Sequence, residues 1–324
     1  MEHSVNIGAE SERAWQQPRG GFAAALQFLR ALAATPIGAI GLVIVTGLIL
    51  MALFAPVLPI KDPLFLYLDH RLEAPSAQFL FGTDQSGRDI LSRVVWGARA
   101  SLAIGVFVVA IGLVLGVLIG LVAGYYSRTW IEEVLMKCME VLASIPLLIW
   151  AIAMVGVLGV QPTVLGPFSL SNEVKLTLLI GLLYTPGLAR LTHGLVLNEA
   201  QAEYVLARRV QGASTWAILV SDILPNVISP VLVQATILMG VAIIVEASLS
   251  FIGLGVQPPT PSWGSLLSDA RTLIFSGEWW VSVFPGLTVV LAVLGLNLLG
   301  DAMRVVLDPR RGAGGPRGEA RELV

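Results

Sequence analysis

Residues 199–226 read EAQAEYVLARRVQGASTWAILVSDILPN, a polar interruption in a chain that is otherwise mostly apolar. Within it, Tyr204 and Val205 stand among charged residues, which predicts a short amphipathic helix from about Glu199 to Val210. Two interpretations fit such a helix. It lies on a membrane surface, or its apolar ridge inserts into a groove of a soluble partner. Periodicity alone leaves both open.

Residues that break or cap helices follow. Gly212 suits the left-handed position that ends a helix, because glycine adopts positive φ without steric cost. Ser214 or Thr215 then caps a second short helix, and Pro225 is expected to end that helix before the next apolar segment. The loop from residue 190 to 228 is far longer than a turn requires, and long loops in compact domains are usually functional.

The composition of the whole chain explains why this stretch stands out. Of 324 residues, 56% are hydrophobic and 13% are charged, against about 25% charged in ordinary soluble domains. The mean hydropathy is +0.81. These values argue against a soluble enzyme or a disordered protein, and the net charge of −2 disfavours a nucleic-acid binder.

Six apolar segments approach or exceed the roughly 20 residues that a bilayer span needs. They cover residues 36–58, 100–125, 141–160, 176–189, 229–254 and 279–299. The predicted fold class is an all-α integral membrane protein with six transmembrane helices. Residues 1–35 are an N-terminal tail that can carry an interfacial helix at about 22–32. Residues 36–99 hold the first span and a long outer loop, 100–304 a five-helix core with the 190–228 loop, and 305–324 a C-terminal tail.

Lysine and arginine counts orient the chain. With both termini inside, 13 of these residues fall in inner segments and 7 in outer segments. Positive residues favour the cytoplasmic side. The sequence therefore predicts a multi-pass protein of a bacterial or archaeal inner (cytoplasmic) membrane, with both termini cytoplasmic.

Four glycines share one face of the second span, because they recur at four-residue spacing: Gly112, Gly116, Gly120 and Gly124. Such a face lets another helix approach closely. The sequence favours a contact within the bundle, and a subunit interface is the alternative.

Glu246 is the one carboxylate inside a predicted span. A charge in lipid is costly and is a functional candidate, here together with Ser248 for the translocation path. The favoured alternative is a structural hydrogen-bonding role close to Ser248 and Ser250.

Several kinds of chemistry have no matching motif. The chain contains no phosphate-cradling G-x-x-x-x-G-K-[ST] run, no H-E-x-x-H and no G-x-S-x-G. Its three histidines and one cysteine are scattered, so we expect no metal site and no cofactor. No span holds a chain of acidic residues or histidines, which argues against a proton-coupled secondary transporter.

The loop between the fourth and fifth predicted spans resembles that of a known family. Residues 204–214, YVLARRVQGAS, followed by DILPN at 222–226, are similar to the "EAA" loop of inner-membrane permeases from binding-protein-dependent ABC importers. Leu206 stands where that loop has a glutamate, Arg208 where it has a second alanine, and Asp222 where it usually has a histidine.

Further stretches resemble the C-type subunit of the dipeptide, oligopeptide and nickel subfamily. They are residues 81–94 (FGTDQSGRDILSRV) with 97–102, residues 141–148 (VLASIPLL) preceded by Met136-Lys137, residues 246–268, and residues 297–310. The resemblance covers about residues 35 to 311.

The resemblance implies a permease subunit that is not itself an enzyme. Its partners would be a paralogous permease forming a heterodimer, two cytoplasmic ATPase subunits that hydrolyse ATP, and a periplasmic or lipid-anchored solute-binding protein. The implied cargo is di- or oligopeptides. Nickel chelates, glutathione or another small solute are the alternatives, and a secondary transporter or a non-transporting membrane scaffold is a weaker one.

The resemblance also implies roles for particular residues. The cytoplasmic coupling helix would contact the ATPase through Glu199, Glu203, Tyr204, Val205, Leu206, Ala207, Arg208, Arg209, Gly212, Ala213, Ser214 and Pro225. An outer group would face the binding protein or shape the outer gate: Gly82, Thr83, Asp84, Gly87, Arg88, Asp89, Trp263 and Gly264. For Asp84 or Ser86 a plainer role is capping the helix that leads into the second span.

Overall fold

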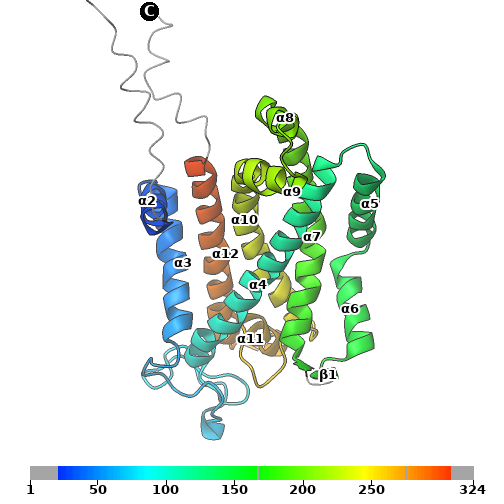
Figure 1. Cartoon of the computed structure of the whole chain (residues 1–324). Coiled ribbons are helices and arrows are strands. Elements are labelled where there is room, and N and C mark those ends of the chain that lie inside the picture. Colours follow the sequence, from blue (N-terminus) through cyan, green and yellow to red (C-terminus); the bar gives the residue numbers. More distant parts are fainter. Residues whose placement is uncertain (1–20, 166–167, 274–275, 308–324) are drawn as a thin grey trace, which may run out of the picture.

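The computed structural model describes residues 21–165, 168–273 and 276–307, and these residues form a helical bundle with one short β-hairpin (Figure 1). Five helical runs are long and apolar enough to cross a membrane: α3 (Pro36–Phe54), α4 (Ile90–Tyr125), α7 (Asn172–Glu199), the run Thr215–Phe251, and α12 (Trp280–Leu307). A bent pair, α5 (Trp130–Ser144) and α6 (Leu147–Leu158), makes a sixth candidate. The all-α membrane fold with five or six spans is therefore confirmed.

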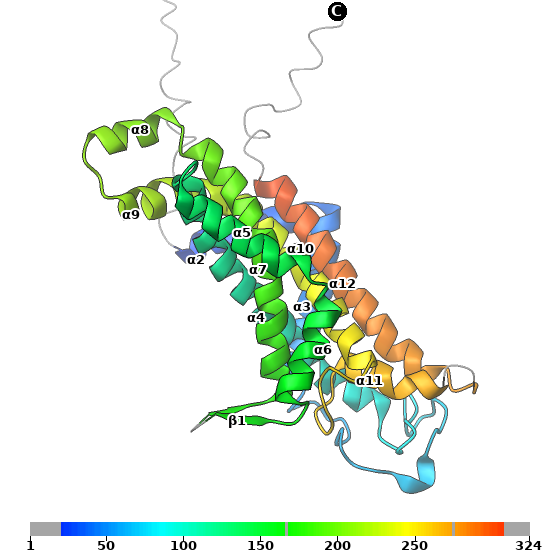
Figure 2. The same ribbon diagram turned by 90° about the vertical axis from the view of Figure 1, so that its right-hand side faces the viewer.

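The two ends of the bundle differ. One end carries α2 (Gly21–Ala33), the end of α12, and the projecting pair α8 (Glu203–Val210) and α9 (Thr215–Ala217) (Figures 1 and 2). The other end carries the hairpin of β1 (Thr163–Leu165) and β2 (Phe168–Leu170), α11 (Trp263–Ala270), and the loop after α3. The two described ends of the chain thus lie on the same side as α8. The expectations for residues 1–20 and 308–324 fall outside the described residues.

The second span starts ten residues earlier than the sequence suggested. Asp89, rather than Asp84 or Ser86, caps α4, because its side chain accepts a hydrogen bond from the Ser92 backbone N–H. The predicted boundary at residue 99/100 therefore falls inside a continuous helix. The polar residues in the first turns of α4 lower the local hydropathy, so a hydropathy count does not include these turns in the span. Ile90 is nevertheless fully buried there.

The third span is broken, so the single helix predicted at 141–160 is wrong. Helices α5 and α6 meet at 83°. Pro146 disfavours the α conformation at the residue before it, and Ile145 is extended, with φ −95° and ψ 126°. Beyond α6, the buried Lys175 of α7 donates through its Nζ to the backbone oxygens of Gly159 and Gln161 at 2.6 and 2.9 Å. This lysine holds the end of α6 against α7.

Two further predictions about helix ends are wrong. Helix α7 spans 28 residues rather than the predicted 176–189, and Pro186 lies inside it. Pro225 does not end the second short helix. From α9 the chain continues through the π-helical stretch η3 (Ile218–Ile223) into α10 (Leu224–Phe251), and Pro225 occupies the first turn of α10. Proline is tolerated there because the first N–H groups of a helix have no intrahelical partner.

The centre of the bundle is a close contact between α4 and α7. A Cβ added to Gly116 would lie 2.6 Å from Leu188 Cβ, and one added to Gly120 would lie 2.5 Å from Thr192 Cβ. Gly112 and Gly124 face Tyr184 and Val196 of the same helix. The structure thus places all four glycines of this face against α7, within the chain.

Candidate functional site

Helix α8 ends in a complete glycine cap. Gly212 has φ +78°, its N–H donates to the Arg209 oxygen at 3.0 Å, and the Ala213 N–H donates to the Arg208 oxygen at 3.1 Å. This is the Schellman arrangement expected of a glycine at that position. Ser214, one of the two predicted caps, then begins α9 by accepting from the Ala217 N–H at 3.3 Å. Helix α8 starts at Glu203, and Glu199 belongs to the end of α7.

Val205 anchors α8 to the bundle. It is fully buried and packs in an apolar cluster with Val196 of α7, Leu219 of η3 and Val227 of α10. Neighbouring residues of α8 point outward instead: Leu206 is 47% exposed and Val210 is 89% exposed. The helix therefore has an inner face fixed by one valine and an outer face that carries apolar side chains in solvent.

Polar contacts tie the same hairpin to the ends of α7 and α10. Asn226 Nδ2 donates to the Tyr204 hydroxyl at 2.8 Å and to a Glu199 carboxylate oxygen at 3.1 Å. The Tyr204 hydroxyl also hydrogen-bonds to Glu199 and to the Asp222 backbone oxygen, the latter at 3.2 Å. Burial and the adjacent Glu199 carboxylate raise the pKa of Tyr204 to about 12.

The two arginines of α8 also have partners. Arg208 Nε lies 3.1 Å from Asp222 Oδ2, so the aspartate that replaces the motif's usual histidine pairs with the arginine that replaces its second alanine. The guanidinium of Arg209 lies 4.6 Å from the centroid of the Tyr125 ring, at the end of α4. These contacts bring the hairpin residues Tyr204, Arg208 and Arg209 against three different helical runs. Asn226 and Asp222 were not among the predicted site residues, although both lie in the matching motif.

At the opposite end, Asp84 organises the outer segment. Its Oδ1 accepts from the backbone N–H groups of Ser86 and Arg88 at 2.8 and 2.9 Å. Its Oδ2 lies 2.8 Å from Arg88 Nε and 2.5 Å from Arg93 Nη1. Both arginines also reach Asp269 at the end of α11. Asp84 is only 1% exposed, so it holds the loop to α4 and α11. Asp269, which shares both arginines with Asp84, was not among the predicted site residues.

The other residues predicted for the outer group are also packed inside the chain. Thr83 is fully buried and pairs with Asp89 in an isolated β-bridge. Gly82 and Gly87 have φ of +74° and +81°, and a Cβ at either would collide with a backbone oxygen of the same loop. In this arrangement these residues shape the outer end rather than offer a free surface.

Trp263 and Gly264 begin α11 in the interior. The Trp263 indole N–H donates to the Val94 oxygen at 3.0 Å. A Cβ at Gly264 would lie 2.7 Å from Ala247 Cα on α10. Helix α11 therefore lies against α4 and α10 with no room for a larger residue at 264.

Glu246 is fully buried beside this contact. Its Oε1 accepts from the hydroxyls of Ser250 and Ser262 at 2.8 and 3.2 Å, and its Oε2 lies 3.4 Å from the Ser101 hydroxyl. The carboxylate thus joins α10, the cap of α11 and α4. Ser248, which was grouped with it, is exposed and donates to the Ile244 backbone oxygen instead.

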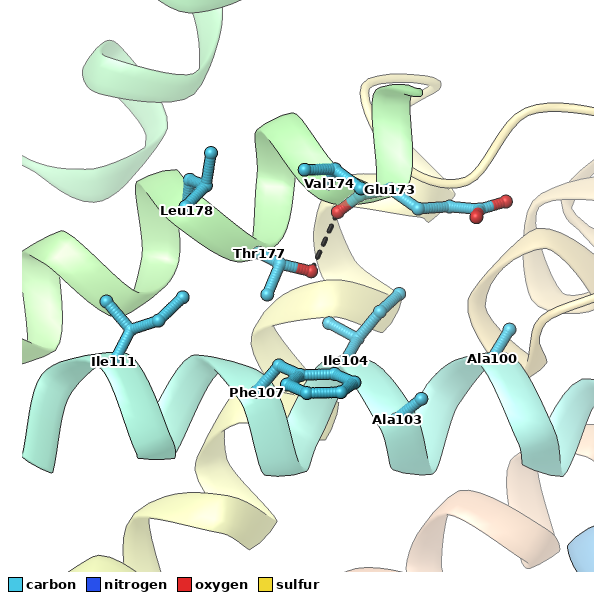
Figure 3. A pocket seen from close by; sticks show the side chains of 9 residues that line it. All are labelled: Ala100, Ala103, Ile104, Phe107, Ile111, Glu173, Val174, Thr177 and Leu178. Carbon is cyan, nitrogen blue, oxygen red and sulfur yellow. Dashed lines mark hydrogen bonds between the residues drawn. The ribbon is translucent and has the colours of Figure 1, made fainter. Parts of the chain in front are cut away.

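A hollow of about 420 Å³ lies between α4 and α7 (Figure 3). Its walls are mostly apolar, and Phe107 is 61% exposed beside it. The Thr177 hydroxyl is already bonded to the Glu173 backbone oxygen at 2.7 Å. Glu173 is the charged side chain of this lining, and it would repel an anionic solute.

Comparison with known proteins decides the family. Residues 116–312 match the family described as "Binding-protein-dependent transport system inner membrane component". The chain belongs to this family. It is therefore a multi-pass permease subunit of an ABC importer, and not itself an enzyme. Membership implies partners of two kinds, ATPase subunits and a solute-binding protein.

Named relatives cover most of the permease. The dipeptide transport system permease protein DppC of Alkalihalophilus pseudofirmus is 41% identical, covering 84% of this chain and 85% of the relative. The di/tripeptide permease DppC of Pseudomonas aeruginosa is also 41% identical, over 83% and 87%. The glutathione permease GsiD of Pectobacterium atrosepticum is 39% identical, over 75% and 76%.

A solved structure has the same fold. The permease resembles a chain of the MetNI methionine ABC transporter in inward-facing conformations, with a TM-score of 0.52 and 21% identity. The match covers 68% of this chain and 98% of the other. At this level of identity the likeness concerns the fold alone.

Proposed function

We propose that this permease forms half of the translocation pathway of an ATP-driven importer of di- and oligopeptides, in a heterodimer with a paralogous permease. The observation that carries the substrate class is the 41% identity to two permeases named for dipeptide and di/tripeptide transport. The membrane would be the inner membrane of a bacterium or archaeon. The predicted inner segments hold more lysine and arginine than the outer ones, 13 to 7 with Arg190 counted toward the inner end of α7, which supports cytoplasmic termini.

Helix α8 is the proposed coupling helix. Its exposed face, with Leu206 and Val210, would sit in a cleft of an ATPase subunit, as an amphipathic helix sits in a groove. Because Asn226, Tyr204 and Glu199 join α8 to α7 and α10, a shift of the helix would pull on both spans. Closure of the ATPase pair would thus reach the membrane as a rigid-body movement.

The outer group has a proposed role at the opposite end. The Asp84, Arg88, Arg93 and Asp269 cluster would keep the outer segment in one shape, so that the solute-binding protein meets a preformed surface. The peptide would enter from the binding protein when the pathway opens outward.

The experiment is reconstitution of the complete importer. The permease, its paralogue, both ATPase subunits and the binding protein are placed in vesicles, and uptake of a labelled dipeptide is measured with and without ATP. We expect uptake that requires ATP and the binding protein. Uptake that persists without ATPase subunits would indicate a secondary transporter, and an absence of any uptake from a correctly assembled complex would indicate a scaffold.

Glutathione is the second candidate cargo, because the glutathione permease is 39% identical. Competition separates the two. An excess of unlabelled dipeptide should suppress dipeptide uptake strongly, whereas an equal excess of glutathione should suppress it little. The reverse ranking would assign the importer to glutathione.

A further inference from the structure

Arg190 is a charged residue on α7, a helix long and apolar enough to span a membrane. Arg190 lies about 27 Å along α7 from Asn172, at about 1.5 Å per residue, and the helix extends nine residues further to Glu199. Its side chain is exposed. Among the described residues no carboxylate lies within ion-pair distance of it. A charged side chain in a span is costly unless it faces water or a partner, and such residues commonly mark substrate pathways.

Arg190 lines a pocket of about 400 Å³ formed by α5, α7 and α10. Two more polar side chains share the lining, Tyr184 of α7 and Gln234 of α10. The Tyr184 hydroxyl is buried and has no hydrogen-bond partner among the described residues. Unpaired buried donors are uncommon in folded proteins, and each asks for an explanation such as an absent ligand.

The helix face around Arg190 is also open. Gly187 and Gly194, one turn before and after it, would gain a Cβ without meeting any atom within 4 Å. The four glycines of α4 that face α7 have no such room, because a Cβ added to any of them would lie 2.5 to 3.1 Å from its nearest atom. Pro186 lines the same pocket, and a proline inside a helix leaves the carbonyl four residues earlier without its donor. The pocket therefore combines free space with two groups that have no polar partner among the described residues, the Arg190 guanidinium and the Tyr184 hydroxyl.

Resting on the proposed function, we propose that Arg190, with Tyr184 and Gln234, forms a transit site for the C-terminal carboxylate of the peptide. A guanidinium binds a carboxylate through two parallel N–H donors, and the phenol and amide add donors beside it. The carboxylate would supply the charge partner that Arg190 lacks among the residues that the structure describes. The larger hollow between α4 and α7 has Glu173 in place of a cation, which would oppose the same ligand.

The test compares a dipeptide with its C-terminal amide in the reconstituted complete importer. Both are supplied at concentrations that saturate the binding protein, as measured separately, so that the permease sets the difference. We expect wild-type importer to take up the carboxylate form faster. In Arg190→Gln the ratio of the two uptake rates should fall about tenfold, the factor that loss of one charge-assisted pair commonly represents. Arg190→Lys should keep part of the preference, and Tyr184→Phe should lower it to a smaller degree.

Arg304→Gln is the matched control, since Arg304 is exposed at the end of α12 and does not line the pocket. It should leave the ratio unchanged. An Arg190→Gln importer that loses both substrates equally, or that no longer assembles with the paralogous permease, would overturn the transit site and assign Arg190 to a structural or subunit contact. Wild-type uptake of neither peptide would instead contradict the proposed cargo, so the two failures are distinguishable.

Discussion

At the scale of single residues, Gly212 has a requirement that is conformational and not steric. Its φ is +78°, and an added Cβ would meet nothing within 4 Å. An L-residue pays about 1–2 kcal/mol in this region, and a β-branched residue pays more. A substitution at Gly212 therefore introduces backbone strain without a steric clash against neighbouring atoms.

We predict that Gly212→Val uncouples ATP hydrolysis from uptake. The strained cap would tilt or fray the end of α8, which should lower dipeptide uptake about fivefold or more for each ATP hydrolysed. Gly212→Asn is the control, because asparagine tolerates positive φ, and it should retain most of the coupling. Both rates are measured in the same vesicles. Normal uptake by the valine variant would contradict the role of this cap.

The buried carboxylate of Glu246 can be tested by substitution. Replacement by leucine leaves the hydroxyls of Ser101, Ser250 and Ser262 without their shared acceptor, and each unsatisfied buried group costs about 1–3 kcal/mol. Glu246→Leu should lower the melting temperature in detergent by several degrees. Glu246→Gln keeps a carbonyl acceptor and should cost less, and Ser248→Ala, on the exposed face, should cost nearly nothing. Equal melting temperatures for all three would refute a structural role.

Single residues also show where sequence reasoning succeeds. Gly212 was predictable because positive φ and glycine are linked by local sterics. The contact of the Asp84 cluster with α11 was not, since Asp269 lies 185 positions further along the chain than Asp84 and joins the cluster only through the two arginines. The favoured interpretation of Glu246 required only its neighbour Ser250. Its contacts to Ser101 and Ser262 depend on how α4 and α11 pack.

At the scale of elements, the close packing of α4 on α7 can be tested with a matched pair of glycines. A side chain at Gly120 collides with Thr192 Cβ at 2.5 Å and the Ala189 backbone oxygen at 2.7 Å. Gly47 lies in the middle of α3 and has open space around it. Both are helical glycines on membrane spans, so they differ mainly in what faces them.

We predict that Gly120→Val destabilises the permease by about 1–3 kcal/mol or more, the usual cost of overpacking, whereas Gly47→Val is close to neutral. The melting temperature of the purified protein in detergent provides the comparison. Similar losses in both variants would mean that helix propensity, and not the α4–α7 contact, sets the effect.

The sequence predicts the presence of the membrane spans better than the residues at which they begin, break and end. Hydropathy located every span, because lipid requires about 20 apolar residues whatever their order. It missed the start of α4, where Ile90 and Val94 pack against protein beside charged Arg93. It also missed the break in the third span, whose cause is the single Pro146 between two apolar stretches.

At the scale of the whole molecule, one continuous run joins the two ends of the bundle. From Thr215 to Phe251 the chain is helical over 37 residues, about 55 Å at 1.5 Å per residue. One end carries the contacts of Asn226 with α8, and the other carries Glu246 and the cap of α11. A movement imposed on α8 therefore has a continuous helical path to the opposite end of the bundle.

The proposed contact with the ATPase lies on the exposed face of α8. Leu206 is 47% exposed on α8 and stands where the family motif has a glutamate. If this permease meets its own ATPase through an apolar contact, Leu206→Glu would bury a charge without a partner. We predict that it weakens binding of the purified ATPase subunits about tenfold, while Leu206→Met has little effect. Stability should change little in either, because the position is on the surface. Unchanged or tighter binding by the glutamate variant would mean that the ATPase cleft still carries the partner for the motif's charge.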